Sequence, residues 1–313
     1  NTTTDTSSRS PFSSATATAT LNLRPPNQAP NANSGGRMLL DLGSNANDTA
    51  FSLAIKADGK ILIAGATTAL PDGSSRWHLN YGVVQLNANG SLDTTFGDLV
   101  GSSRTGKTLL NLGTNTEDAA YSVATQADGK ILIAGYTNAQ PTTSSGSSSN
   151  YGIVRLNTDG TLDTTFGDLV GSSRTGKTLL DLGTNTDDQA RSVVVQADGK
   201  ILIAGYTNAQ PPGAPGIKLN YGVVRLNANG TLDTTFGDLV GSSRTGKTLL
   251  DLGTNTDDQA RSVVVQADGK ILIAGYTNAQ PPGAPGIKLN YGVVRLNANG
   301  TLDTTFGDLV GSS

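Results

Sequence analysis

A constant internal period of 70 residues is the feature of this sequence that most restricts its fold. The segment Ala57–Gly65, with the sequence ADGKILIAG, returns at Ala127, Ala197 and Ala267. Repeats of this size form propellers, solenoids or arrays, in which each unit buries its apolar faces only against its neighbours. The sequence therefore divides into an extension, residues 1–36, and four copies, residues 37–106, 107–176, 177–246 and 247–313.

Within one copy, short β-branched runs alternate with turns that contain Gly. Ser192–Gln196 leads through a turn into Lys200–Tyr206, which is the pattern of a hairpin. A second predicted hairpin joins Tyr221–Leu226 to Thr231–Asp233, and Lys177–Leu182 is a candidate fourth strand after a loop. The first two strands are apolar on both faces, so neighbouring sheets must cover them. The sequence predicts an all-β fold of four tandem repeats, each with about four short antiparallel strands, either β-propeller-like or an open stacked array.

The most regular part of each copy also carries a family resemblance. Gln196–Gly205, followed by Tyr221–Gly237 with the sequence YGVVRLNANGTLDTTFG, resembles the delta-60 repeat. That family is known from large bacterial surface and secreted proteins and is similar to NHL-type propeller blades. The resemblance covers all four copies and implies a propeller-like fold and an exported bacterial protein. It brings no common catalytic residues, and this chain departs from the pattern in its longer period and its four copies.

The composition excludes several classes of partner and cofactor. Charged residues make up 15% of the chain and its net charge is −3, so nucleic-acid binding has no electrostatic basis. The absence of Cys excludes disulfides and thiolate metal sites. No run approaches the ~18 apolar residues of a membrane span. The chain begins at Asn1 rather than Met, which fits either the removal of a leader or a fragment of a longer repeat protein, and we expect a secreted, extracellular or cell-surface protein.

Two motifs resemble binding sites but lack the context that their chemistry requires. Gly101–Thr108 matches the phosphate-binding loop G-x-x-x-x-G-K-[ST], yet the continuation Leu109–Gly113 is too short for the required helix. The loop Thr184–Asp188 offers oxygen ligands suited to Ca²⁺ but lacks the spacing of an EF-hand loop. We therefore expect no nucleotide and no cofactor, and Ca²⁺ is the one candidate ion.

Catalysis has equally little support in the sequence. Carboxylates such as Asp163 and Asp168 recur in other copies, whereas an active site usually needs a singular arrangement of acids. The only His, His78, lies beside the only Trp, Trp77, in a loop that differs strongly between copies. This loop is either a tolerant surface tip or a recognition surface in which Trp77 and His78 contact a ligand such as a surface glycan.

The extension before the repeats contains nine residues of strict alternation, Ala15–Leu23. Its apolar positions are Ala15, Ala17, Ala19, Leu21 and Leu23. The pattern predicts a half-buried strand, and such a strand needs a partner edge. We expect this strand to be donated to another subunit, so that copies associate head to tail into an oligomer or a fibre. The alternative is a disordered Thr/Ser-rich tail.

The two ends of the repeat array suggest a second route to association. The last copy stops before the Lys-Thr-Leu-Leu-Asp-Leu strand that follows earlier copies, and the first copy supplies its own version, Arg37–Leu42. Inside one chain, pairing of these ends closes a ring. Between chains, the same pairing joins subunits by β-augmentation.

These observations favour a non-enzymatic structural or adhesive β-repeat protein that self-assembles by strand donation. The alternative is a carbohydrate-binding, lectin-like β-propeller, which glycan binding dependent on Trp77 would support. A hydrolase is a third hypothesis from a different class, and glycoside turnover would support it.

Overall fold

Every regular element that the structure describes is a β-strand. The computed structural model describes residues 36–43, 46–70, 78–141, 148–211, 213–214, 216–281, 283, 286 and 288–307. Within these residues the strands form four larger antiparallel sheets, one for each repeat, and three two-stranded hairpins. The prediction of an all-β fold built from four repeats is confirmed.

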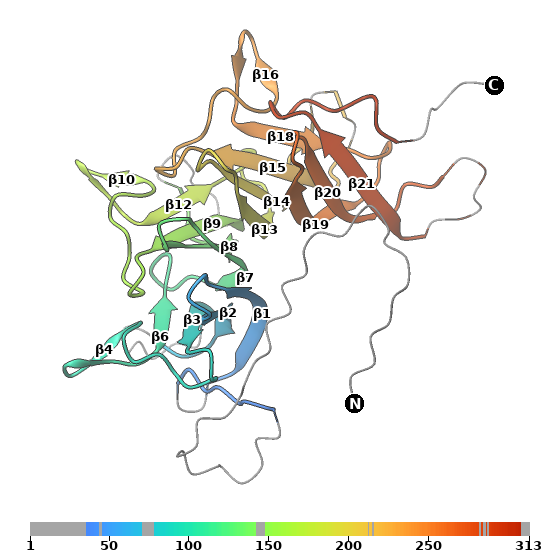
Figure 1. Cartoon of the computed structure of the whole chain (residues 1–313). Helices are drawn as coiled ribbons and strands as arrows, with labels where there is room; N and C mark the ends of the chain where they lie inside the picture. Colours follow the sequence, from blue (N-terminus) through green and yellow to red (C-terminus); the bar gives the residue numbers. More distant parts are fainter. Residues whose placement is uncertain are drawn as a thin grey trace, which may run out of the picture.

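The four sheets follow one another along the chain, from the blue sheet at the amino-terminal end of the array to the red sheet at the other end (Figure 1). Sheet 1 has the strand order β1 (Asp48–Ile55), β2 (Ile61–Thr67), β3 (Asn80–Leu86) and β6 (Lys107–Leu110). Sheet 2 consists of β7 (Asp118–Thr125), β8 (Ile131–Thr137), β9 (Asn150–Leu156) and β12 (Lys177–Leu180). Sheet 3 consists of β13 (Asp188–Val195), β14 (Ile201–Thr207), β15 (Asn220–Leu226) and β18 (Lys247–Leu250). Sheet 4 consists of β19 (Asp258–Val265), β20 (Ile271–Thr277) and β21 (Asn290–Leu296).

The connection from the third to the fourth strand of a sheet differs from the expectation in two respects. The predicted return strand Thr231–Asp233 is reduced to a single bridge between Leu226 and Leu232, because the chain turns away after the Asn-Gly turn. The loop that follows contains an additional small hairpin. These hairpins are β4 (Leu99–Val100) with β5 (Ser103–Arg104), β10 (Leu169–Val170) with β11 (Ser173–Arg174), and β16 (Leu239–Val240) with β17 (Ser243–Arg244).

The sheets are offset from the sequence repeats. Strand β18, which opens the fourth sequence copy, pairs with β15 of sheet 3, and Tyr221 and Val223 lie opposite Leu250 and Thr248. Each sheet thus takes its fourth strand from the segment that leads to the next sheet. The equivalent segment before sheet 1, residues 37–42, is described by the structure but forms no strand.

Successive sheets pack face to face, and the cores lie between them. One cluster combines Leu62 and Tyr81 of sheet 1 with Ile131, Ile133 and Val154 of sheet 2, and clusters of the same kind join sheets 2 and 3 and sheets 3 and 4. The first strands of successive sheets also contact one another, since β1 lies against β7, β7 against β13 and β13 against β19. The expectation that the apolar first and second strands are covered on both faces holds for the second strands of sheets 2 and 3, because β8 and β14 are buried over Ile131–Gly135 and Ile201–Gly205. On the first strand β13, Val193 is buried, whereas Val194 and Val195 are half-buried.

A buried Tyr on the third strand forms a hydrogen bond from each sheet to the next. The Tyr81, Tyr151 and Tyr221 hydroxyls donate to the carbonyl oxygens of Gly152, Gly222 and Gly292, at 3.0, 2.9 and 2.9 Å. Gly is required at these positions: a Cβ on Gly222 would lie 2.5 Å from Leu182 Cδ2 and 2.8 Å from Tyr151 Oη. The interface between sheets is therefore specific as well as apolar.

The array is open at its ends. Tyr291 of β21 occupies the same position as the three buried tyrosines, yet it is 96% exposed. Sheet 1 therefore does not cover the far face of sheet 4, and the four sheets of one chain do not close into a ring.

Candidate functional site

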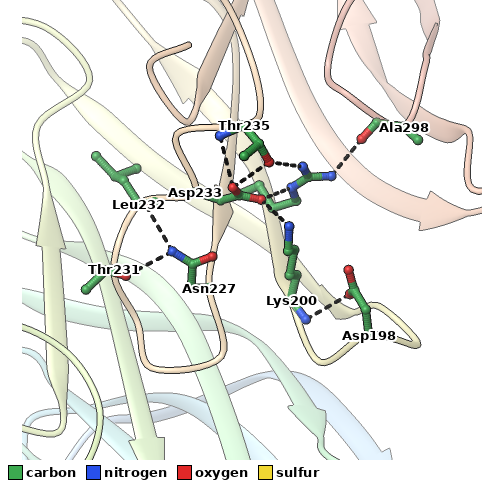
Figure 2. A network of polar contacts seen from close by, with 9 residues as sticks. Asp198, Lys200, Asn227, Thr231, Leu232, Asp233, Thr235 and Ala298 are labelled. Atoms are coloured by element: carbon green, nitrogen blue, oxygen red, sulfur yellow. Dashed lines mark hydrogen bonds and ion pairs between the residues drawn. The ribbon is translucent and has the colours of Figure 1, made fainter. Parts of the chain in front are cut away.

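The largest charged cluster of each repeat surrounds an Asp in the turn after the third strand. In sheet 3 Asp233 Oδ2 accepts from Lys200 Nζ at 2.8 Å and from Arg225 Nε at 2.7 Å, and its other oxygen accepts from the Thr235 hydroxyl at 2.7 Å. Figure 2 shows this network, in which Arg225 also reaches across to the Ala298 carbonyl of the next repeat at 2.6 Å. The cluster therefore joins two strands of one sheet and then joins that sheet to its neighbour.

The electrostatics of this cluster favour a permanently ionised carboxylate. Burial opposes the charge of Asp233, but the hydrogen bonds from Lys200 and Thr235 and the charge of Arg225 outweigh it and hold the pKa of Asp233 well below its usual value. The Arg225 guanidinium also lies over the ring of Phe236, 4.6 Å from its centroid. An acid held in this way is a poor proton donor or acceptor near neutral pH, so the geometry suits a structural role.

The same cluster occurs in every copy. Its acids are Asp93, Asp163, Asp233 and Asp303, each with a Lys at 2.8 or 2.9 Å. Only sheet 1 departs from the pattern, because Gln85 replaces the Arg and donates to Asp93 at 2.6 Å. The sequence indicated part of this cluster, because Arg225 and Asp233 lie at a constant spacing on either side of one Asn-Gly turn. Lys200 belongs to a separate hairpin, so its contact with Asp233 could not be predicted from that spacing.

A second buried acid lies at the start of the first strand of sheets 2, 3 and 4. Asp188 Oδ2 accepts from the backbone amide of Leu182 at 2.7 Å and from the Thr186 hydroxyl at 3.2 Å. Burial raises the pKa of Asp188 to about 7, although these hydrogen bonds oppose the shift. Burial raises the pKa of Asp118 and Asp258 in the same way. These acids order the chain where it passes from one sheet to the next.

The first strands also carry a column of side chains that a β-bulge turns outward. The register of each strand shifts at Phe51, Tyr121, Arg191 and Arg261, and a bulged residue is re-aimed relative to its neighbours. Tyr121 lies 4.9 Å from the ring of Phe51, and the Arg191 guanidinium lies 3.8 Å from the centre of the Tyr121 ring. Tyr136 stacks on Tyr121 at 5.8 Å. This half-buried column of aromatic rings and guanidinium groups was not foreseen from the sequence.

Of the two residues proposed for ligand contact, the structure describes only one. Trp77 lies outside the described residues. His78 is described, and its Nδ1 lies 3.2 Å from Oε1 of Glu117 in the next repeat. The other carboxylate oxygen of Glu117 accepts from the backbone amide of Leu79 at 3.0 Å. His78 therefore lies at a contact between sheets 1 and 2.

The segment that matches a phosphate-binding loop is followed by a strand and not by a helix, as the short stretch after it predicted. Residues Ser103–Arg104 and Lys107–Leu110 form strands β5 and β6, so no helix follows the Gly-rich turn. The equivalent Lys177 donates to the backbone carbonyl of Asn111 at 2.6 Å. These lysines therefore hydrogen-bond the backbone of the preceding repeat and do not point into an open loop.

The Asp-rich loop directs its oxygen atoms into its own hydrogen bonds. Thr186 Oγ1 lies 3.0 Å from Asp181 Oδ1 and 3.0 Å from the Gly183 carbonyl oxygen, and Asn185 has a left-handed backbone with a φ of 57°. Among the residues that the structure describes, no group of three or more His, Cys, Asp or Glu side chains is placed to hold a metal ion. Ca²⁺ binding stays a prediction without a coordination geometry.

The proposed assembly strand, with Ala15, Ala17, Ala19, Leu21 and Leu23, lies outside the described residues. The described part of the chain has no helix that is long and apolar enough to cross a membrane.

The stacked antiparallel sheets of three or four strands, joined by equivalent contacts in successive repeats, define a β-propeller repeat protein. The sequence matches the family described as "Domain of unknown function (DUF5122) beta-propeller" over residues 56–96, 126–166, 196–236 and 266–306, a little over half of the chain. The chain belongs to this family. The match confirms the expected relation to propeller repeats, although it does not carry the delta-60 name.

The other comparisons add little about function. No curated protein matches the chain. A solved structure titled "Crystal structure of a GH43_12 retrieved from capybara gut metagenome" matches with a TM-score of 0.41 and 9% identity. The match covers 80% of this chain and 40% of that one, so the chain spans less than half of that protein. A likeness at this level carries no argument about activity.

Proposed function

We propose that this chain is a non-enzymatic structural or adhesive repeat module of a secreted or cell-surface protein. The observation that supports the proposal is that charged side chains join strands and repeats in the same way in successive copies. Asp233 accepts hydrogen bonds from Lys200 and Arg225, and Arg225 also donates to the Ala298 carbonyl of the next repeat. Asp163 and Asp303 accept from the equivalent Lys and Arg side chains, and Arg155 beside Asp163 also reaches the next repeat. A catalytic site needs acids with different environments and different pKa values, whereas these acids are ionised in the same way in each copy.

Activity and stability measurements on matched variants test this proposal. Asp233→Asn removes the charge that Lys200 and Arg225 contact, so we expect a lower midpoint of urea unfolding and no change in any turnover. The purified chain is assayed against a panel of chromogenic glycosides and chromogenic esters in parallel. Turnover above background that Asp233→Asn abolishes would contradict the structural role and restore the hydrolase hypothesis.

Location and the proposed strand donation need separate tests. Fractionation of the native cells, with detection of the chain by antibody, tests export, and recovery only inside the cell would contradict it. Deletion of residues 1–35 tests the donated strand Ala15–Leu23, because an unchanged assembly state in the truncated chain would exclude it.

A lectin-like function is the second candidate, and the bulge column supports it. Aromatic rings that keep part of their faces exposed bind apolar faces of ligands, and Tyr121 and Tyr136 are only half-buried beside Arg191. Glycan-array binding that Tyr136→Ala abolishes would favour this function at the column. Binding that only Trp77→Ala abolishes would instead place the ligand at the variable loop.

A further inference from the structure

We infer that the interface between sheets 1 and 2 binds a guanidinium group, carried by a small molecule or by an arginine side chain of a partner. The site lies where the following interfaces contain an Arg of the chain itself and sheet 1 has Gln85. The inference goes beyond the proposed function and does not depend on it, because it concerns binding and not turnover or assembly.

The equivalent interfaces show what the Arg does. In sheet 3, Arg225 Nη1 donates to the Ala298 carbonyl of the next repeat at 2.6 Å, and Nη2 lies 3.2 Å from the Thr235 hydroxyl oxygen (Figure 2). Arg155 of sheet 2 makes the same two contacts with the equivalent residues. The guanidinium group thus bridges a turn of one sheet and a turn of the next sheet.

Gln85 is too short to make this bridge. Its amide nitrogen donates to Asp93 at 2.6 Å, so it contacts the acid as Arg does but does not reach the next repeat. The two oxygens equivalent to those beside Arg225 are the Thr95 hydroxyl, which donates to Asp93, and the Thr158 carbonyl. No described residue donates a hydrogen bond to the Thr158 carbonyl. Both oxygens can therefore accept hydrogen bonds from a ligand.

A cavity of about 650 Å³ lies at this place, and Thr95 and Thr158 both line it. Both threonines are exposed, so solvent reaches the cavity. Its charged lining residues are Lys56, Asp58, Lys60 and Asp159. Cavities of this volume are typical of small-molecule sites, in which a few polar groups fix the orientation of the ligand.

The charges around the cavity favour a cation. Asp159 stands where the next two repeats have Asn229 and Asn299, so this interface has an additional carboxylate. Gln85 stands where those repeats have Arg, and Lys56 stands where they have Gln, so the two exchanges leave the number of positive charges unchanged. Compared with the interface between sheets 2 and 3, this one therefore carries one more negative charge.

Lys56 does not replace the bridging guanidinium. Its ammonium donates to Gln85 Oε1 at 3.2 Å, and it makes no other hydrogen bond within the described residues. The Gln85 side chain and Lys56 therefore contact each other on the sheet 1 side of the cavity, and the Thr158 carbonyl lies in the next repeat.

Asp159 is an ordered and ionised carboxylate beside the cavity. Its Oδ2 accepts from Arg104 at 2.6 Å, and its Oδ1 accepts from the Thr161 hydroxyl at 2.7 Å. Burial opposes its charge, but the hydrogen bonds from Thr161 and the charge of Arg104 outweigh this effect and lower the pKa of Asp159. A guanidinium group has a planar fork of N–H donors, so it suits several separated acceptor oxygens better than a compact ammonium does.

Isothermal titration of the whole chain tests the inference with matched probes. The blocked amino acid N-acetyl-L-arginine methylamide is compared with its lysine analogue, and we expect saturable binding of the arginine compound only. Free L-arginine is titrated in parallel to identify the source of the group. Binding of the blocked compound alone indicates a side chain of a partner, whereas binding of free arginine as well indicates a small molecule, and either result supports the site.

Gln85→Arg is the matched variant, because it gives sheet 1 the residue of the other sheets and so places the chain's own guanidinium in the cavity. We expect binding to weaken about tenfold or more, since a hydrogen bond to a charged group contributes about this factor. Asp159→Asn, which introduces the residue of the later repeats, should also weaken binding. Circular dichroism shows that each variant is folded.

Three results would overturn the inference. The first is no saturable binding of the blocked arginine at millimolar concentration, the second is unchanged binding in Gln85→Arg and in Asp159→Asn, and the third is equal binding of the lysine analogue. Each of them leaves the non-enzymatic role intact, since that role depends on the turnover assays.

Discussion

Replacement of Tyr221 and of Tyr291 by Ala compares the same side chain in two environments. Tyr221 is fully buried between sheets 3 and 4, and its hydroxyl donates to the Gly292 carbonyl at 2.9 Å. Tyr291 occupies the same position on sheet 4 and is almost fully exposed. Residues 171–243 are identical to residues 241–313, so the two tyrosines have the same local sequence. Any difference in cost therefore measures the packing of the next repeat.

The expected cost is large for Tyr221→Ala and small for Tyr291→Ala. Truncation of a buried aromatic residue lowers the free energy of unfolding by about 3–5 kcal/mol, and loss of one hydrogen bond contributes about 1 kcal/mol of that total. Substitution at an exposed surface position usually changes stability by about 0.5 kcal/mol or less. Tyr221→Phe should cost about 1 kcal/mol, because it keeps the ring and removes only the hydroxyl.

Urea unfolding followed by far-ultraviolet circular dichroism measures these costs, with the protein dilute enough to be monomeric. Stability in a repeat array is distributed over units and interfaces, so local opening near sheet 4 is followed in parallel by hydrogen exchange. Equal losses for Tyr221→Ala and Tyr291→Ala in the monomer would refute the open face of sheet 4.

Three further outcomes follow from the buried groups. Burial raises the pKa of Asp188 to about 7, so the folded state keeps a proton that the unfolded state releases above pH ~4. The free energy of unfolding should therefore fall as the pH rises from about 4 to about 7. Urea midpoints measured across this range should fall less steeply in Asp188→Asn, whereas Asp198→Asn, in an exposed turn, should leave the slope unchanged. Gly222→Ala places a methyl group 2.5 Å from Leu182 Cδ2, so we expect a cost of about 1–3 kcal/mol in the same unfolding assay, and an unchanged midpoint would contradict the tight approach. Isothermal titration of the wild type and of Lys107→Ala with ATP should show no saturable binding, and micromolar binding lost in the variant would show that the strand β6 does not prevent a nucleotide site.

Local patterns in the sequence determined the strands, the turns and the repeat. Val193–Val195 and Ile201–Ile203 are apolar on both faces, and only stacked sheets cover such strands. The Asp-Gly and Asn-Gly turns fixed where hairpins reverse, since Gly adopts a positive φ at Gly199 and Gly230. These features act over a few residues, so the sequence was enough to predict them.

Other features depended on which segments meet in space. The division into copies at Lys107 and Lys177 does not show that β6 and β12 belong to the preceding sheets, because strand pairing over a long connection leaves no local pattern. The predicted Thr231–Asp233 strand forms one bridge only, since Asp233 turns inward to Lys200 and Arg225. The candidate residues His78 and Trp77 were singled out for their rarity, whereas the polar clusters that the structure shows are common residues brought together by the stacking of sheets.

Tyr221 and Tyr291 show the limit of the sequence most directly. Their surrounding residues are identical for a full repeat, yet one side chain is buried and the other is exposed. The sequence determined that each unit would present apolar strand faces that need a neighbouring sheet. Only the tertiary structure decided which of these faces is covered, because burial depends on whether a following sheet lies against it and not on the residues of the face itself.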